Sequence, residues 1–149
     1  MKRTNFYNIH KKLGAKLVEF AGFEMPIQYS SIIAEHKTVR NSVGVFDVSH
    51  MGEVFVKGEK ALDFVQHIAV NDTSKLQTGR VQYTAMCYED GGIVDDLLVY
   101  KIADDEFLLV INASIQPWRA ATSHSTKIPM SKIYRRAMTS AFCLLIRFR

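Results

Sequence analysis

The chain has 149 residues, of which 48% are hydrophobic and 23% charged, a composition typical of one globular domain or part of a larger one. Its two cysteines, Cys87 and Cys143, do not predict a disulfide framework, so a reducing compartment is the simpler expectation. No apolar stretch follows the basic residues near Met1, and no segment approaches a run of about 20 apolar residues, so we expect neither a secretory signal nor a spanning helix. We therefore expect a soluble cytoplasmic protein with no membrane partner.

The formal net charge of +4 is unevenly distributed along the chain. Residues 1–106 carry 12 basic and 15 acidic side chains, a net of −3, whereas residues 107–149 carry 7 basic side chains and no acidic one. Such a basic segment is typical either of a contact with nucleic acid or a membrane, or of a segment that does not belong to the fold. We favour the second interpretation, so no nucleic-acid partner is expected.

Three short helices are predicted from capping residues and apolar spacing. They cover Asn5 to Lys12, Ser31 to Ser42, and residues 58–69. Asn5 is expected to cap the first helix. Gly14 and Gly44 are expected to end the first and second helices. The apolar face of the third helix predicts that it packs on a sheet.

Extended segments are predicted between and after these helices. They cover residues 15–29, with breaks at Ala21-Gly22 and Pro26, residues 43–58, with an interruption near His50 to Gly52, and residues 79–113. The last segment is predicted to form three antiparallel strands with turns at residues 89–92 and 103–106. Together the elements predict an α+β fold in which helices pack on an antiparallel sheet.

Two adjacent carboxylates, Asp95 and Asp96, begin the apolar strand in "GGIVDDLLVY". Because side chains alternate along a strand, Asp96 shares a face with Tyr100, and Asp95 faces the opposite way. One carboxylate can remain hydrated near the turn. The other is aimed where Tyr100 points, with Tyr83 nearby if the hairpin register allows it. The pattern fits a carboxylate that caps local N–H groups, and it also fits one that grips a nitrogen-containing ring and handles a proton.

Other catalytic chemistry has little support in the sequence. The histidines lack H-E-x-x-H spacing and no cysteine cluster accompanies them, so no metal site is predicted. There is no G-x-S-x-G elbow and no glycine-rich phosphate loop between a strand and a helix. Cys87 is expected to be a small buried hydrophobe and not a nucleophile.

Five phrases, in order along the chain, carry a resemblance to a known family. They read "LVEFAGFEMPIQY", "VRNSVGVFDVSHMGEVFVKG", "VNDTSKL", "YTAMCYEDGGIVDDLLVYKI" and "LLVINAS". Over about Met1 to Ser114 the chain resembles the N-terminal third of the glycine cleavage system T-protein, aminomethyltransferase. The resemblance implies an α+β folate-binding architecture. It also implies an activity that transfers a methylene group from aminomethyl-lipoyl H-protein to tetrahydrofolate and releases ammonia.

The resemblance also implies roles for individual residues. Asp96 matches the essential carboxylate of "GGIVDDL" and would be the catalytic residue, holding the reacting amine edge of the folate and raising its nucleophilicity or accepting a proton. Tyr83 and Tyr100 would line the pterin and aminobenzoyl region. Met51 would pack against the ring system, and Asn112 would add a polar contact. Tetrahydrofolate would be the one-carbon acceptor, the lipoyl-carrying H-protein the partner, and no metal would take part.

After "INAS" the sequence departs from the family pattern. We therefore expect residues 1–114 to form part of a folate-binding domain and residues 115–149 to be a basic tail, frame-shifted or disordered. A folate site that lacks part of the surrounding residues that hold it in place would work poorly, so we expect a truncated and impaired copy of the enzyme. Two alternatives remain: a noncatalytic folate-binding or decayed fragment, and a folate-dependent relative such as a demethylating dehydrogenase or a tRNA-modification protein.

Overall fold

The structure is a computed structural model that describes residues 1–113, 133–136 and 143–147. Most of the predicted tail, residues 115–149, therefore lies outside the described residues. By its internal contacts the chain divides into two compact units. The first unit is Met1–His50 with Met138–Arg149, and the second unit is Met51–Ala137.

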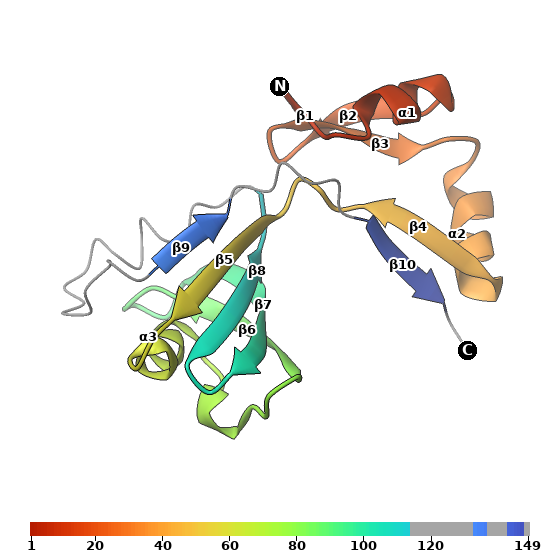
Figure 1. Ribbon diagram of the computed structural model, residues 1–149. Helices are drawn as coiled ribbons and strands as arrows, with labels where there is room; N and C mark the ends of the chain where they lie inside the picture. Colours follow the sequence, from red (N-terminus) through yellow and green to blue (C-terminus); the bar gives the residue numbers. More distant parts are fainter. Residues whose placement is uncertain (114–132, 137–142, 148–149) are drawn as a thin grey trace. The chain divides into compact units, whose positions relative to one another are not determined.

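The first unit combines short helices with two small sheets (Figure 1). Its helices are α1 (Tyr7–Lys12) and α2 (Ile32–Asn41). One sheet has the strand order β1 (Lys2–Arg3), β3 (Phe23–Gln28), β2 (Lys16–Phe20), and in the other β4 (Val43–Asp47) pairs antiparallel with β10 (Cys143–Arg147).

Ser31 and Glu35 fix the start of α2, as the capping pattern predicts. Ser31 is the N-cap residue, and its Oγ accepts a bond of 3.5 Å from the backbone N–H of Ala34. Glu35 Oε1 accepts bonds of 2.7 Å from the Ser30 N–H and 2.9 Å from the Tyr29 N–H. These backbone bonds, the one from Ser30 above all, lower the pKa of Glu35.

Two of the predicted helix ends are wrong. Phe6, and not Asn5, is the N-cap residue of α1, and its side chain makes no capping bond. Gly44 lies inside β4, where an added Cβ would come within 2.5 Å of Val39 Cγ2. The glycine thus permits α2 and β4 to approach closely. Gly14 does follow α1 with a left-handed φ of 75°, as predicted.

The β2–β3 hairpin turns at Ala21 and Gly22, which both have positive φ, at 50° and 82°. At Pro26 the strand does not end, because β3 continues to Gln28, but the predicted irregularity is present: the register against β2 shifts between the pairs Leu17–Pro26 and Lys16–Gln28. β1 pairs with β3 only as far as Glu24, so Pro26 has a free edge on that side. A missing N–H costs no ladder bond there.

A buried histidine links α1 to the ends of two strands in the first unit. His10 is 6% exposed, its Nε2 lies 2.8 Å from Asp47 Oδ2, and its Nδ1 lies 2.8 Å from the Tyr29 hydroxyl. Asp47 Oδ1 accepts bonds from the Ser49 N–H and hydroxyl at 2.9 and 2.6 Å. Burial by itself would raise the pKa of Asp47, but the hydrogen bonds from His10 and Ser49 outweigh it and lower the pKa.

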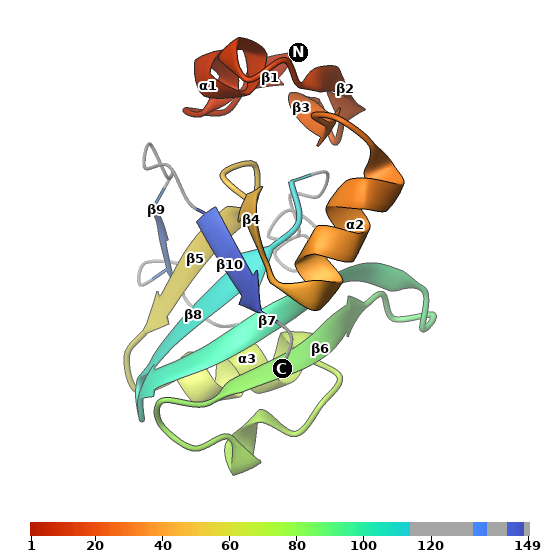
Figure 2. The same cartoon turned by 90° about the vertical axis from the view of Figure 1, so that its right-hand side faces the viewer.

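The second unit is built on an antiparallel sheet with the strand order β6-β7-β8-β5-β9, seen side by side in Figure 2. Its elements are β5 (Gly52–Lys57), α3 (Ala61–Ile68), the 3₁₀ turn η1 (Thr73–Lys75), β6 (Val81–Cys87), β7 (Ile93–Ala103), β8 (Glu106–Ile111) and β9 (Ile133–Arg136). The predicted three-stranded segment and the predicted helix on the sheet are confirmed, as is the α+β fold class.

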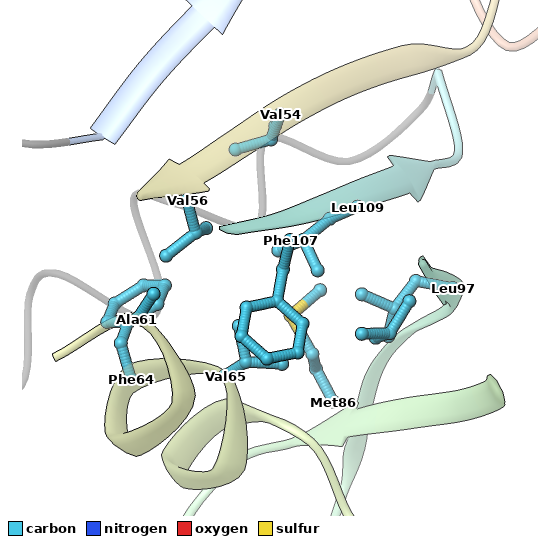
Figure 3. Packing of buried hydrophobic residues seen from close by; sticks show 10 residues of the cluster. Val54, Val56, Ala61, Phe64, Val65, Met86, Leu97, Phe107 and Leu109 are labelled. Carbon is cyan, nitrogen blue, oxygen red and sulfur yellow. The ribbon is translucent and has the colours of Figure 1, made fainter. Parts of the chain in front are cut away.

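The core of the second unit lies between the sheet and α3 (Figure 3). Phe107 of β8 is fully buried and points towards Val65 of α3, with Met86 beside it. Burying a side chain of this kind contributes about 1.5–3 kcal/mol relative to leaving it exposed. The cluster comprises Val54, Val56, Ala61, Phe64, Val65, Met86, Leu97, Val99, Phe107 and Leu109. The cluster therefore includes Leu97 and Val99, the side chains of β7 that lie on the same face as Asp95.

Candidate functional site

Strand β7 separates the two adjacent carboxylates onto opposite faces of the sheet. Asp95 is 5% exposed and lies on the core face with Leu97 and Val99. Asp96 is exposed, on the other face with Tyr100. The predicted alternation is confirmed.

Asp96 has a hydrogen-bond donor on each carboxylate oxygen. The Tyr83 hydroxyl donates to Oδ2 at 2.8 Å, and Asn112 Nδ2 donates to Oδ1 at 3.1 Å. The hydrogen bond to Asp96 and the negative charge of this carboxylate raise the pKa of Tyr83. Because a carboxylate offers about four acceptor positions and Asp96 is exposed, it can still accept bonds from a ligand.

The environments of the two carboxylates differ from the prediction. The sequence predicted that one acid is hydrated near the turn and that the other lies on the face of Tyr100. The exposed acid, Asp96, is the one on the Tyr100 face, and Asp95 is buried. Burial is tolerated because Asn112 supplies Asp95 with two donors, its backbone N–H at 3.3 Å and its Nδ2 at 2.9 Å. Sequence reasoning missed this contact because it depends on the register of β7 against β8.

The two remaining predicted site residues, Met51 and Tyr100, lie along the same sheet at different distances from Asp96. The register pairs Gly52 with Ile111, so half-buried Met51 comes to the end of β8 that carries Asn112. Tyr100 lies four residues beyond Asp96, about 13 Å along the strand. Its cross-strand neighbours are Val81 and Leu108. The hydrogen bonds therefore unite Asp96, Tyr83 and Asn112, while Tyr100 stands further along the face.

Between Asp96 and Tyr100 the outer face of β6, β7 and β8 is mostly apolar, and the polar side chains near it are Asn112 and Glu53, which pairs with Val110. Val81 and Tyr83 of β6 are 48% and 66% exposed, and Leu98, Leu108 and Val110 are half-buried beside them. Such a surface, with the hydrogen-bonded carboxylate of Asp96 beside it, suits a flat heterocycle that carries N–H donors. The arrangement provides both a stacking surface and an acceptor for a proton.

Cys87 is exposed, so the expectation that it is a buried hydrophobe is wrong. It is the last residue of β6 and follows Met86, after which the register against β7 shifts. Within the described residues, no three His, Cys, Asp or Glu side chains gather in a way that could hold a metal ion. None of the helices in the same part of the chain is both long and apolar enough to cross a membrane.

Comparison with known proteins decides the family. The sequence matches the family described as the GCVT N-terminal domain over residues 6–145. The chain belongs to this family. The GCVT match includes residues 115–145, and the domain boundary at residue 114 stays a prediction.

Curated relatives of this GCVT domain support the same assignment. This chain is 60% identical over 114 residues to the aminomethyltransferase of Chloroherpeton thalassium. The match covers 76% of this chain and 32% of that protein. The chain is 54% identical over 127 residues to the aminomethyltransferase of Flavobacterium psychrophilum, covering 84% of this chain and 35% of that protein. The chain thus spans about a third of the length of the curated relatives it matches.

A solved structure supports the GCVT fold as well. The crystal structure of glycine cleavage system aminomethyltransferase T from Bartonella henselae superposes with a TM-score of 0.75 at 34% sequence identity. The match covers 97% of this chain and 37% of that chain. The predicted resemblance to the N-terminal part of the T-protein is confirmed.

Proposed function

We propose that this GCVT domain supplies the folate-binding carboxylate of an aminomethyltransferase. In the proposed reaction, the methylene carbon of the aminomethyl-lipoyl arm of an H-protein bonds to two nitrogens of tetrahydrofolate, its bonds to the lipoyl sulfur and to the amine break, and the lipoyl thiol and ammonia are released with the two protons that the folate nitrogens lose. The observation that supports the proposal is the exposed carboxylate of Asp96, held at both oxygens by Tyr83 and Asn112 on the outer face of the sheet. The names of the curated relatives and of the Bartonella henselae protein support it as well.

Asp96 would act on the reacting amines of tetrahydrofolate. A carboxylate that accepts a hydrogen bond from an amine N–H increases the electron density on that nitrogen and favours its attack on the methylene carbon. The same group can accept the proton that the amine loses when the new C–N bond forms. Its fixed orientation favours this role, because a catalytic group works best when it is held in place before the substrate arrives.

Tyr83 and Tyr100 would provide the surface for the pterin and aminobenzoyl rings. The Tyr83 hydroxyl is engaged by Asp96, so the ring is oriented while its exposed surface remains available for stacking. Met51 and Asn112, at the same end of the sheet, would add an apolar contact and a polar contact.

The decisive experiment compares two charge-neutralising variants. Asp96→Asn removes the proposed acceptor, whereas Asp105→Asn removes an exposed carboxylate in the β7–β8 turn and serves as the control. We measure ammonia release from aminomethyl-lipoyl H-protein with tetrahydrofolate, and tetrahydrofolate affinity by calorimetry. For Asp96→Asn we expect turnover to fall by about 10²-fold or more with a smaller loss of affinity. Unaltered turnover in Asp96→Asn would dismiss the catalytic role.

A further inference from the structure

We infer that Asp95 is a positioning residue: it fixes the side-chain amide of Asn112, and through that amide it fixes the carboxylate of Asp96. The structural part of this inference concerns only the second unit. Its consequence for ligand binding rests on the proposed function. The observations that carry it are the burial of Asp95 and the contacts within hydrogen-bond distance that the backbone N–H and Nδ2 of Asn112 make with Asp95 and Asp96.

Asp95 is held by one residue at both of its oxygens. The Asn112 N–H donates to Oδ2 at 3.3 Å, and Asn112 Nδ2 donates to Oδ1 at 2.9 Å. The two bonds close a ring between the Asp95 carboxylate and Asn112. In the ladder Leu97 of β7 pairs with Ile111 of β8, and this register places Asp95 close to Asn112, which directly follows Ile111. A carboxylate that is 5% exposed needs such donors, because an unpartnered buried charge is costly.

Asn112 transmits this constraint to Asp96. Its Nδ2 carries two hydrogens and also lies 3.1 Å from Asp96 Oδ1 and 3.3 Å from the Asp96 carbonyl oxygen. Because an amide nitrogen donates and an amide oxygen accepts, only one orientation of the Asn112 amide satisfies both carboxylates. Asp95 selects that orientation from the buried side of the sheet.

Two residues hold the carboxylate of Asp96, namely Asn112 and Tyr83, and of these Asn112 is the one whose own position is fixed, by its bonds to Asp95. The other is Tyr83, whose ring is 66% exposed and is restrained by the bond to Asp96 itself. Asn112 is hydrogen-bonded to the buried carboxylate of Asp95 in β7. Tyr83, in contrast, lies on β6, the edge strand of the sheet. Functional groups need support of this kind to stay within about half an ångström of the working geometry.

Nuclear magnetic resonance on the isotope-labelled 149-residue chain tests the inference without any ligand. The two readouts are the protection of the Asn112 side-chain NH₂ protons from solvent exchange and the Hα–Hβ couplings of Asp96, which report its χ1 rotamer. Asp95→Asn leaves one neutral acceptor in place of two charged ones, so Asn112 loses one hydrogen bond and the other is weakened. We expect loss of protection at the Asn112 amide and averaging of the Asp96 couplings over several rotamers.

Val99→Ala is the matched control. Val99 lies on the same buried face of β7, and its truncation destabilises the second unit without touching Asn112. If Asp95 only stabilises the fold, both variants change the urea midpoint and neither changes the Asp96 couplings. A single Asp96 rotamer with a protected Asn112 amide in Asp95→Asn would overturn the inference. If Asp95→Asn does not fold, Asn112→Ala decides: the inference requires averaged Asp96 couplings there too, and a fixed rotamer would overturn it.

A tetrahydrofolate titration separates this inference from the proposed function. If the unaltered chain binds tetrahydrofolate, we expect Asp95→Asn to weaken binding by about tenfold, as the loss of a hydrogen bond to a charged group predicts. Unchanged affinity alongside averaged Asp96 couplings would overturn the functional consequence. If the unaltered chain does not bind, the proposed function fails, while the couplings still decide whether Asp95 positions Asp96.

Discussion

The hydroxyl of Tyr83 donates a hydrogen bond of 2.8 Å to Asp96 Oδ2, and the bond joins β6 to β7 on the face of the sheet away from the core. The two residues are not directly opposite in the ladder, because Tyr83 pairs with Leu98 and Asp96 pairs with Ala85. The phenol therefore reaches diagonally across the strands, within the range that long aromatic side chains span. This contact gives the candidate site its most accessible spectroscopic signal.

The first prediction concerns the titration of Tyr83. The hydrogen bond to Asp96 and its charge raise the pKa of Tyr83 above the ordinary value of 10.0. In Asp96→Asn both causes are removed, so we expect the Tyr83 pKa to fall towards 10.0. The ¹³C shift of the ring carbon that carries the hydroxyl, followed between pH 8 and 12, measures it. Asp105→Asn should leave it unchanged, and an equal Tyr83 pKa in wild type and Asp96→Asn would refute the contact.

The second prediction concerns the acid stability of the first unit. The folded pKa of Asp47 is lower than its ordinary value of 3.8, so its contribution to the free energy of unfolding is complete above that value. The contribution is lost as the pH falls through the lower, folded pKa. Urea unfolding at pH 7 and at steps below pH 4, followed by resonances of the first unit, should show this loss. Asp47→Asn should reduce the pH dependence, and a variant with the wild-type profile would contradict the role of the His10–Asp47 contact.

The third prediction concerns the core of the second unit. Phe107 is fully buried between the sheet and α3, so Phe107→Ala should lower the free energy of unfolding by about 3–5 kcal/mol. Val81, on the exposed edge strand β6, is 48% exposed. Val81→Ala should change stability by about 0.5 kcal/mol or less. Comparable urea midpoints for the two variants would show that the packing around Phe107 is not as described.

The fourth prediction concerns a close approach between β5 and β8. A Cβ on Gly52 would lie 2.9 Å from Ile111 Cγ1 and 3.1 Å from its Cδ1. Gly52→Ala should therefore force the Ile111 side chain to move and cost about 1–3 kcal/mol. Ile111→Ala removes the atoms that clash, so the cost of Gly52→Ala should be smaller in that background. Additive effects of the two substitutions on the free energy of unfolding would argue against the close contact.

Strand alternation and capping chemistry account for what the sequence predicted well. Period-two alternation along β7 separated Asp95 from Asp96, and Ser31 marked the start of α2. Both features depend on residues that are neighbours along the chain. Gly44 misled the prediction because a glycine after a helix usually ends it, whereas here the glycine makes room for Val39.

The contacts that the sequence did not predict join residues far apart in the chain. His10 and Asp47 are 37 residues apart, and Asn112 reaches back 17 residues to Asp95. Each of these contacts depends on which strand ends meet and in which register, and no local pattern encodes that. The burial of Asp95 depends on the same register, since the donors that satisfy this buried carboxylate come from Asn112, directly after β8.

The most direct test of the account is a titration of tetrahydrofolate into the ¹⁵N-labelled chain, followed by the backbone and side-chain amide shifts. We expect saturable shifts concentrated at Tyr83, Asp96 and Asn112, and a loss of these shifts in Asp96→Asn but not in Asp105→Asn. Saturable shifts confined to α3 and the core face of the sheet, or no saturable shift at all, would contradict a folate site at Asp96.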